Sequence, residues 1–494
     1  MNSDGGPHGP APIARPGETC WRVEAARRVA LIVDAADYFR AAKAAMLKAR
    51  HTIMLIGWDF DTRIELEHGP RADDGAPNTL GSLLPWIADR RPGLHIHVLR
   101  WDLGVVKVFG RGTTLLTIAR WAWHERIHLR LDGAHPAGAA HHHKILVIDD
   151  ALAFCGGIDM TADRWDTREH LDDDPRRRRP TTRRRYGPWH DATAAVDGAA
   201  ARALGEHARE RWRLASGERL DAPPPGSDPW PEGLRPAFRD VEVAVARTAP
   251  AHAGGAEVRE VEALYRAAIG AAERFVYMES QYFASRIVAE AIAARLREPD
   301  GPEFVVVNPS SAEGWLEEEA MGSARARLVS ILRGADRSGR FRLYTPVTAN
   351  GRPIYVHAKV MVVDDRLVKV GSSNLNNRSM GYDTECDLAI EATPARPGVA
   401  ETIAACRNGL LGEHLGVGAA EVAAALARTG GLIAAVEELR GGAGRTLRPF
   451  TPPPINDAER FLADHELLDP ERPRTVWYAL TGSPLLRGLR QAGR

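Results

Sequence analysis

Two segments of this 494-residue chain carry a histidine and a lysine two residues apart, followed by an aspartate and a turn of small residues. Both have the form His-x-Lys-x4-Asp. The first holds His142, Lys144 and Asp149, and the second holds His357, Lys359 and Asp364. Each position recurs 215 residues later, and so do the turns at 156–159 and 371–374. A repeat at this distance is too long for a solenoid and indicates two copies of one domain.

The spacing within each copy suits phosphate chemistry. Each motif leads into an apolar run, KILVI at 144–148 and KVMVV at 359–363, that is typical of a strand. Residues two apart on a strand point to the same side, so each histidine projects with its lysine. If the copies face each other, the lysines can hold phosphate oxygens, and the histidines can supply a nucleophile and a proton donor. We therefore expect phosphodiester chemistry with no metal and no cofactor.

The elements around the motifs also repeat. Apolar runs typical of buried strands alternate with helical stretches, at 52–58, 94–101 and 126–131 and again at 274–278, 303–307 and 340–344. This alternation predicts an α/β fold with two homologous lobes, each a mixed, mostly parallel sheet sandwiched by helices. We expect a pseudo-twofold axis between the lobes and the active site at their interface.

Composition shifts suggest domain boundaries. Pro- and Gly-rich stretches mark a leader and a linker. The predicted parts are a flexible leader at 1–20, an N-terminal lobe at 21–219, a linker at 220–235, a C-terminal lobe at 236–395 and a helical extension at 396–494.

Charge and cysteine content limit the classes of function. Lys plus Arg and Asp plus Glu each number 65, which argues against a broadly basic nucleic-acid binder. Four scattered cysteines exclude a zinc ribbon and a dense disulfide framework. We see no signal peptide and no apolar run of about 18 residues. We therefore expect a cytoplasmic protein that touches membranes only at their surface.

The motifs and their flanks resemble the phospholipase D superfamily. The lipid-cleaving branch has similar segments at 141–167, 188–191, 276–283 and 354–390, and the resemblance runs from about residue 30 to 420. It implies that one histidine attacks phosphorus, forming a phosphohistidine, while the other protonates the leaving alcohol and then activates water or a second alcohol. The usual assignment makes His142 the nucleophile and His357 the acid and base, although the two motifs alone do not fix this order.

The resemblance also assigns supporting roles. It places Lys144, Lys359 and Asn374 on the phosphate, and it makes Asp191 and Glu385 the carboxylates that orient the histidines. Ser372, Gly157 and Asp159 complete the expected phosphate environment, and the Gly157/Ser372 and Asp159/Asn374 differences make it asymmetric. The motif groups Asp149 and Asp364 with the catalytic residues, but we expect a mainly structural role at strand ends. Ser280 stands where relatives often have Asn, which leaves one substrate contact open.

Three further features have simpler readings. In the triplet 141–143 only His142 is in register with the second motif, and adjacent strand residues point apart, so chelation is not expected. The arginine-rich run 176–185 is read equally as a solvated loop or as a surface for anionic headgroups. Most tryptophans are expected in the core, with Trp58 and Trp189 near the cleft, and the acids in GWDFD at 57–61 are read as turn residues.

The leading hypothesis is a phospholipase D that cleaves the headgroup of glycerophospholipids, with water or an alcohol as acceptor. A cardiolipin-synthase-like phosphatidyltransferase is the alternative, and a nuclease is less favoured. The expected partners are a phospholipid at a membrane surface and no nucleic acid. We expect a monomer, because one chain carries both motifs.

Overall fold

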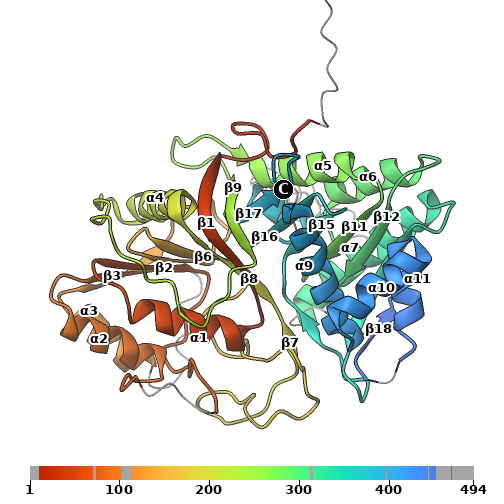
Figure 1. Cartoon of the computed structure of the whole chain (residues 1–494). Coiled ribbons are helices and arrows are strands. Elements are labelled where there is room, and N and C mark those ends of the chain that lie inside the picture. Colours follow the sequence, from red (N-terminus) through yellow and green to blue (C-terminus); the bar gives the residue numbers. More distant parts are fainter. Residues whose placement is uncertain are drawn as a thin grey trace, which may run out of the picture.

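The fold is described from a computed structural model (Figure 1). The structure describes residues 11–69, 74–102, 114–311, 315–396, 398–442, 444–451 and 469.

The first lobe begins and ends with elements that pack on each other, strand β1 and helix α4. Its elements are β1 (Arg22–Val33), α1 (Ala35–Met46), β2 (Thr52–Gly57), α2 (Leu80–Arg90), β3 (His95–Trp101), α3 (Thr114–Ala122), β4 (Ile127–Asp132), β5 (Ile145–Ile148), β6 (Leu152–Gly156), β7 (Trp189–His190), β8 (Ala192–Asp197) and α4 (Gly198–Ser216).

The second lobe repeats this order and adds elements at its end. It contains β9 (Phe238–Ala249), β10 (Val258–Arg259), α5 (Glu260–Ala271), β11 (Phe275–Glu279), α6 (Arg286–Leu296), β12 (Glu303–Val307), α7 (Trp315–Ala335), β13 (Phe341–Val347), β14 (Tyr355–Val356), β15 (Val360–Val363), β16 (Leu367–Gly371), α8 (Asn377–Gly381), β17 (Glu385–Glu391), α9 (Gly398–Leu415), α10 (Ala419–Thr429), α11 (Leu432–Leu439) and β18 (Thr446–Pro449).

One sheet runs through both lobes. Within the described residues it has 16 strands, and β1 pairs antiparallel with β9 at its centre. Outward from this pair, the first lobe has the order β1-β8-β6-β5-β2-β3-β4 and the second has β9-β17-β16-β15-β11-β12-β13. The two orders correspond strand for strand, which is the pattern of two homologous lobes related by a pseudo-twofold axis.

The sheet is mixed, as predicted, but the expectation of mostly parallel strands is wrong. Parallel pairing is confined in the main sheet to β2-β3-β4 and β11-β12-β13, whose strands are joined by helices. The strands between these sets and the lobe junction pair antiparallel. The reason is connection length, because β5 and β6, like β15 and β16, follow each other through short turns that cannot make a parallel crossover.

Helices cover both faces of the sheet and enclose three apolar cores. Helices α1 and α2 cover one face of the first lobe, and α5, α6 and α7 cover the corresponding face of the second. A third core spans both lobes beneath α4 on one side and α9, α10 and α11 on the other (Figure 1). The strands that carry the motifs are buried along their whole length, which holds them rigidly.

The structure gives more detail on three of the predicted parts of the chain: the leader, the linker and the boundary at 395. Residues 1–10 lie outside the described residues, but 11–20 are not a flexible leader: Ile13 is buried, and its amide N–H donates to the carboxylate of Glu391 at 2.9–3.0 Å. The linker lies against the first lobe, where Trp230 joins the core. The boundary at 395 separates β17 from α9, although α9 covers the second lobe in the place that α4 has in the first.

The segment from 396 onward, expected to be a helical extension, also contains strand β18, which extends the sheet beside β13. Across the described residues, no single helix is long and apolar enough to cross a membrane. One pair, α9 and α10, passes the same test of length and composition when taken together, with a bend of 103° between them.

Candidate active site

Main-chain pairing between the lobes brings the two motifs together. The His142 N–H donates to the Thr384 carbonyl of the second lobe at 3.1 Å, and the His357 N–H donates to the His190 carbonyl of the first at 2.7 Å. Strand β14, just before His357, pairs in parallel with β7 of the opposite lobe. Each motif is therefore fixed at its entry to a buried strand by backbone from the other lobe.

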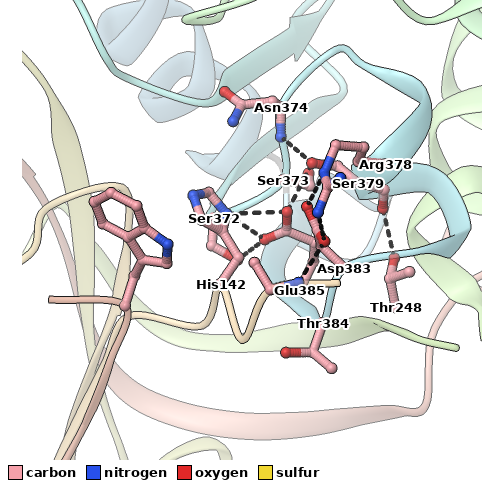
Figure 2. Close-up of polar contacts among 12 residues, drawn as sticks. His142, Thr248, Ser372, Ser373, Asn374, Arg378, Ser379, Asp383, Thr384 and Glu385 are labelled. Carbon is pink, nitrogen blue, oxygen red and sulfur yellow. Dashed lines mark hydrogen bonds and ion pairs between the residues drawn. The ribbon is translucent and has the colours of Figure 1, made fainter. Parts of the chain in front are cut away.

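The carboxylates that contact the histidines cross between the lobes in the same way. Nδ1 of His142 lies 3.0 Å from both oxygens of Glu385, and Nδ1 of His357 lies 2.7 Å from Oδ2 of Asp191. Figure 2 shows the His142–Glu385 contact. A carboxylate at Nδ1 selects the tautomer that is protonated there and leaves Nε2 for chemistry. Each lobe thus supplies one histidine and the orienting acid of the other histidine.

Two hydroxyls hold the carboxylate of Glu385. Ser372 donates to Oε2 at 2.5 Å and Ser379 donates to Oε1 at 2.6 Å (Figure 2). Burial raises the pKa of Glu385 well above its usual range, although Lys144 and the hydroxyls oppose the shift. Burial, with Lys144 and Lys359, lowers the pKa of His142 well below 6.5. The resting imidazole is therefore neutral and carries a lone pair that can attack phosphorus.

The Asp191–His357 pair lies in a different environment. Burial raises the pKa of Asp191 to about 6 against the opposing charge of Lys359. Burial, Lys359 and Arg164 lower the pKa of His357 well below 6.5. The position equivalent to Ser372 is Gly157, where a Cβ would lie 2.2 Å from Oδ1 of Asp191. The sequence difference between the two turns therefore has a steric cause: only glycine leaves room for Asp191.

Both motif lysines are buried beside the histidines. Lys144 donates to the His142 carbonyl at 3.0 Å and pairs with Asp159 at 3.4 Å. Lys359 donates to the His357 carbonyl and to Oε1 of Gln281, the latter at 3.5 Å. Burial, reinforced by Lys144 and only partly offset by Asp191, lowers the pKa of Lys359 to about 7. The arrangement concentrates positive charge between the histidines, where a phosphate would be attracted.

The two equivalent turn residues Asp159 and Asn374 make different contacts. Oδ1 of Asp159 accepts from the Trp58 N–H at 3.2 Å, so Asp159 is held within the first lobe. Asn374 is anchored by its own N–H to Ser379 Oγ at 3.0 Å, while its buried Oδ1 has no hydrogen-bond partner among the residues that the structure describes. A buried polar atom that lacks a partner needs an explanation, and a bound ligand would supply one.

Asp149 and Asp364 lie outside this arrangement, although the motif groups them with the catalytic residues. They follow β5 and β15, whereas the histidines precede these strands, so the two ends are about 13 Å apart at strand spacing. Asp149 accepts from three consecutive N–H groups at 50–52, all at 2.7 Å. Asp364 accepts from those at 273–275, all at 2.9 Å. Both carboxylates tie the start of the neighbouring strand to the hairpin.

Three other residues considered in the sequence, Trp189, Ser280 and His141, have different positions relative to the site. Trp189 stacks on Tyr355 at 4.5 Å and lies 5.3 Å from the His357 ring, so it lines the site. Ser280 accepts from the Leu375 N–H at 3.0 Å and therefore braces the turn after Asn374. His141 is buried against Asp132 at 3.0 Å, away from the direction of His142, as the alternation along a strand requires.

The acids near Trp58 and the arginine-rich run are engaged inside the protein. Asp59 pairs with Arg100 at 2.7 Å. In the run, Arg177 is buried on Asp166 at 2.9 Å, and Arg179 pairs with Asp163 at 2.8 Å. Much of the run therefore holds its own loop in place.

Several residues at or beside the site were not anticipated, among them Gln281 and Arg164, which act on Lys359 and His357 as described above. Ser379 connects Glu385 with the backbone of Asn374, and its place in the first turn of α8 after the N-cap Asn376 was the signal in the sequence. Asp469 accepts from the N–H groups of Asn377 and Arg378, both at 2.9 Å. Nothing in the sequence connects position 469 with α8, because the contact joins distant parts of the chain.

The chain belongs to the phospholipase D family. The family model described as "Phospholipase D" matches residues 45–223 and 341–462, which include both motifs and both orienting acids. Phospholipase D A of Dictyostelium discoideum is 26% identical over 424 residues, which cover 73% of this chain and 32% of that protein. Phospholipase D alpha 4 of Arabidopsis thaliana is 23% identical, with 75% of this chain and 62% of that protein covered. The chain thus spans 32% and 62% of the length of these two relatives.

A solved structure supports the fold. The crystal structure of phosphatidylserine synthase from Haemophilus influenzae Rd KW20 superposes with a TM-score of 0.52 and 13% identity, over 78% of this chain and 87% of that one. The two-lobed α/β architecture is therefore shared with that structure.

Proposed function

We propose that this chain is a phospholipase D-type phosphodiesterase that cleaves the headgroup from glycerophospholipids through a phosphohistidine. The observation that carries the proposal is the reciprocal pairing of His142 with Glu385 and of His357 with Asp191, beside two buried lysines. Two histidines held by carboxylates at Nδ1, one as a neutral nucleophile and one as a proton donor, suit a two-step displacement at phosphorus beside two buried lysines.

In the first step, Nε2 of His142 attacks phosphorus, so a P–N bond forms and the P–O bond to the headgroup breaks. His357, which takes up a proton on Nε2 as the anionic phosphodiester binds, gives that proton to the departing oxygen, which leaves as an alcohol. Lys144 and Lys359 balance the charge that collects on the phosphate oxygens. In the second step, His357 takes a proton from water, the oxygen bonds to phosphorus, and the P–N bond breaks. The products are phosphatidate and a free His142.

An alcohol can replace water in the second step, because the chemistry at phosphorus is the same. The product is then a new phosphodiester, as in a phosphatidyltransferase, which is the second candidate function. The structural neighbour in Haemophilus influenzae is named a phosphatidylserine synthase, in line with this alternative. We further propose that the chain acts as a monomer at a membrane surface, since both histidine–carboxylate pairs form within one chain.

Headgroup release from a panel of phospholipid vesicles, with and without a primary alcohol, tests the proposal. We expect release from at least one phospholipid and, with the alcohol, a phosphatidyl-alcohol. Loss of release in His142→Ala and His357→Ala assigns the activity to this site. No release from any phospholipid by the intact protein would contradict the proposal, and cleavage of DNA by the same site would favour the nuclease alternative.

A further inference from the structure

A second group of histidines and carboxylates lies next to Asp191 and has no part in the steps above. Its centre is His190, whose two ring nitrogens both contact acids: Nδ1 lies 2.8 Å from Glu413 Oε1, and Nε2 lies 2.8 Å from Glu279 Oε2. We call it the His190 cluster, and its members are His190, Glu279, Glu413, Asp34, Asp166, His170 and His414.

The cluster is buried and joins both lobes. His170, in the loop after β6, lies 3.1 Å from the same Glu413 oxygen and 3.0 Å from Asp166. His414, from α9, lies 3.1 Å from Glu279, which ends β11. The exposed fraction of Glu413 is 5%, and the other members are at or below 1%. Charges buried this deeply must compensate one another.

Because the pKa values of Glu279 and Glu413 are lowered and both acids are therefore ionised, the geometry makes His190 an imidazolium. An imidazole with a carboxylate oxygen at hydrogen-bond distance from each nitrogen donates from both, and only the protonated ring can do so. The surrounding acids outweigh burial, which alone would favour the neutral ring: they raise the pKa of His190 well above 6.5 and that of His170 to about 9. The other groups facing the cluster are Arg168 on Glu413, Arg177 on Asp166, Tyr277 on Glu279, and Asp34 at 3.4 Å from His190 Nδ1.

The cluster reaches the catalytic histidine through two consecutive residues. The His190 carbonyl accepts from the His357 N–H, and the Asp191 carboxylate contacts Nδ1 of the same histidine. Asp34 holds the backbone between them, since its carboxylate accepts from the Asp191 N–H at 3.1 Å and its own N–H donates to the Asp191 carbonyl at 2.8 Å. A displacement of His190 therefore moves both contacts of His357.

The other catalytic histidine has no such support. The residue equivalent to His190 is Thr384, whose carbonyl accepts from the His142 N–H. The neighbouring acid, Glu385, is held by the hydroxyls of Ser372 and Ser379, which do not titrate in this range. Thr384 Oγ1 also lies 3.3 Å from Nδ1 of His141, but burial lowers the pKa of that ring, so the His190 support, unlike this one, holds histidines that lose a proton at alkaline pH.

We propose that protonated His190 is a positioning residue for His357, and that proton loss from the His190 cluster at alkaline pH releases the Asp191–His357 pair while the His142–Glu385 pair stays in place. The catalytic consequence rests on the proposed function. Because the histidine pKa is raised on folding, the stabilisation is complete below about pH 6.5, the unfolded value. It is lost as the pH rises through the folded value, about 9 for His170.

The variant Glu413→Gln tests this directly. The amide can keep accepting from His190 and His170, and exposed Arg168 can move aside, but one negative charge is gone. We expect the alkaline midpoint of kcat to move to lower pH by at least one unit. The control Glu437→Gln removes a carboxylate on α11 that accepts from Tyr344 at 2.7 Å, outside the cluster, and should not move the midpoint. Equal midpoints in both variants would overturn the proposal.

A second readout does not depend on phospholipid cleavage. The thermal unfolding midpoint of the wild type should fall between about pH 8 and 10, and the fall should begin at lower pH in Glu413→Gln. If Glu413→Gln does not fold, His170→Gln should remove the part of the fall near pH 9; an unchanged fall would overturn the proposal. If the thermal profile shifts as expected but the protein releases no headgroup, the charged state of the His190 cluster would be supported and the proposed function contradicted.

Elemental analysis supplies a further test. Two sets of ligand atoms in the cluster each lie within 4.8 Å of one another, close enough for a metal ion: those of Asp34, His170, His190 and Glu413, and those of His190, Glu279 and His414. A metal and a proton cannot share one nitrogen lone pair, so the imidazolium account predicts no stoichiometric metal in protein purified without chelators. One bound zinc per chain would overturn it.

Discussion

The Asp191 carboxylate, in the first lobe, lies 2.7 Å from Nδ1 of His357 in the second lobe. In the same way, the Glu385 carboxylate of the second lobe lies 3.0 Å from Nδ1 of His142 in the first lobe. Neither lobe therefore contains both members of either catalytic pair. The lobe interface is part of the catalytic arrangement, because separating the lobes would leave both imidazoles without their acids.

The orienting role of the acids can be tested by neutral, isosteric changes. Asp191→Asn and Glu385→Gln should each lower kcat by about 100-fold or more, because an amide can favour the wrong imidazole tautomer. The two effects should combine to less than their product, since the histidines act as a unit. Steady-state headgroup release measures them, and wild-type rates in either variant would show that the contact has no orienting role.

Gly157→Ala should disable the site through Asp191. The new Cβ would lie 2.2 Å from Oδ1, so the carboxylate must move away from its place beside His357. We expect kcat to fall at least about tenfold while the fold persists. Gly270→Ala, in α5 with no atom within 4 Å of the added Cβ, is the matched control and should leave kcat unchanged. Equal activities of the two variants would refute the steric explanation of this glycine.

Asp149→Ala should affect stability rather than chemistry. Removing a carboxylate that accepts three N–H groups should cost on the order of 3 kcal/mol in the free energy of unfolding. Asp364→Ala should cost less, because the Glu273 and Arg274 N–H groups are exposed to water. Urea denaturation measures the loss, and kcat per folded molecule should stay within about threefold of the wild type. A far larger fall in kcat would place these acids in the chemistry after all.

The lowered pKa of Lys359 predicts that kcat/KM depends on pH. Its pKa of about 7 in the free protein means that the ammonium is present below pH 7 and is lost as the pH rises through 7. Since kcat/KM reports the free enzyme, kcat/KM should fall above this pH. Lys359→Arg keeps the charge at all these pH values and should abolish the fall, even at lower absolute activity. If kcat/KM of Lys359→Arg still falls above pH 7, the fall is due to another group.

Substitutions in the arginine-rich run should have different effects on stability, depending on whether the arginine is buried or exposed. Arg177→Ala removes the guanidinium from buried Asp166, which keeps His170 and the Trp189 N–H as partners, and should lower the free energy of unfolding by about 3 kcal/mol. Arg184, which is exposed, is the control, and Arg184→Ala should change it by less than about 0.5 kcal/mol. Similar losses in both, measured by denaturant titration, would contradict the buried role of Arg177.

The duplicated motif made much of the site predictable. The constant offset of 215 residues identified His142, Lys144, His357 and Lys359 as one unit, and the family resemblance added both orienting acids. Which acid serves which histidine was not predictable, because the crossing depends on how the lobes pair. The His190 cluster was equally hidden, since Glu279 and Glu413 are far from His190 in sequence and meet only after folding.

Local patterns misled where long-range contacts decide the outcome. The arginine-rich run was read equally as a solvated loop or as a surface for anionic headgroups, both of them exposed, yet Arg177 is buried on Asp166, eleven residues earlier. Alternating strands and helices suggested mostly parallel sheets, but the turn at Asp149 reverses the chain without a crossover.

The most direct test of the account is to trap the covalent intermediate. In His357→Ala, a phosphatidyl ester of p-nitrophenol should react without acid assistance, because its leaving group is stable as an anion, and the intermediate should persist because the base is missing. Peptide mass spectrometry after a rapid alkaline quench should then locate one phosphatidyl group on His142. No adduct on any histidine would contradict the phosphohistidine mechanism, and an adduct on His357 in His142→Ala, with none on His142 in His357→Ala, would reverse the assigned roles.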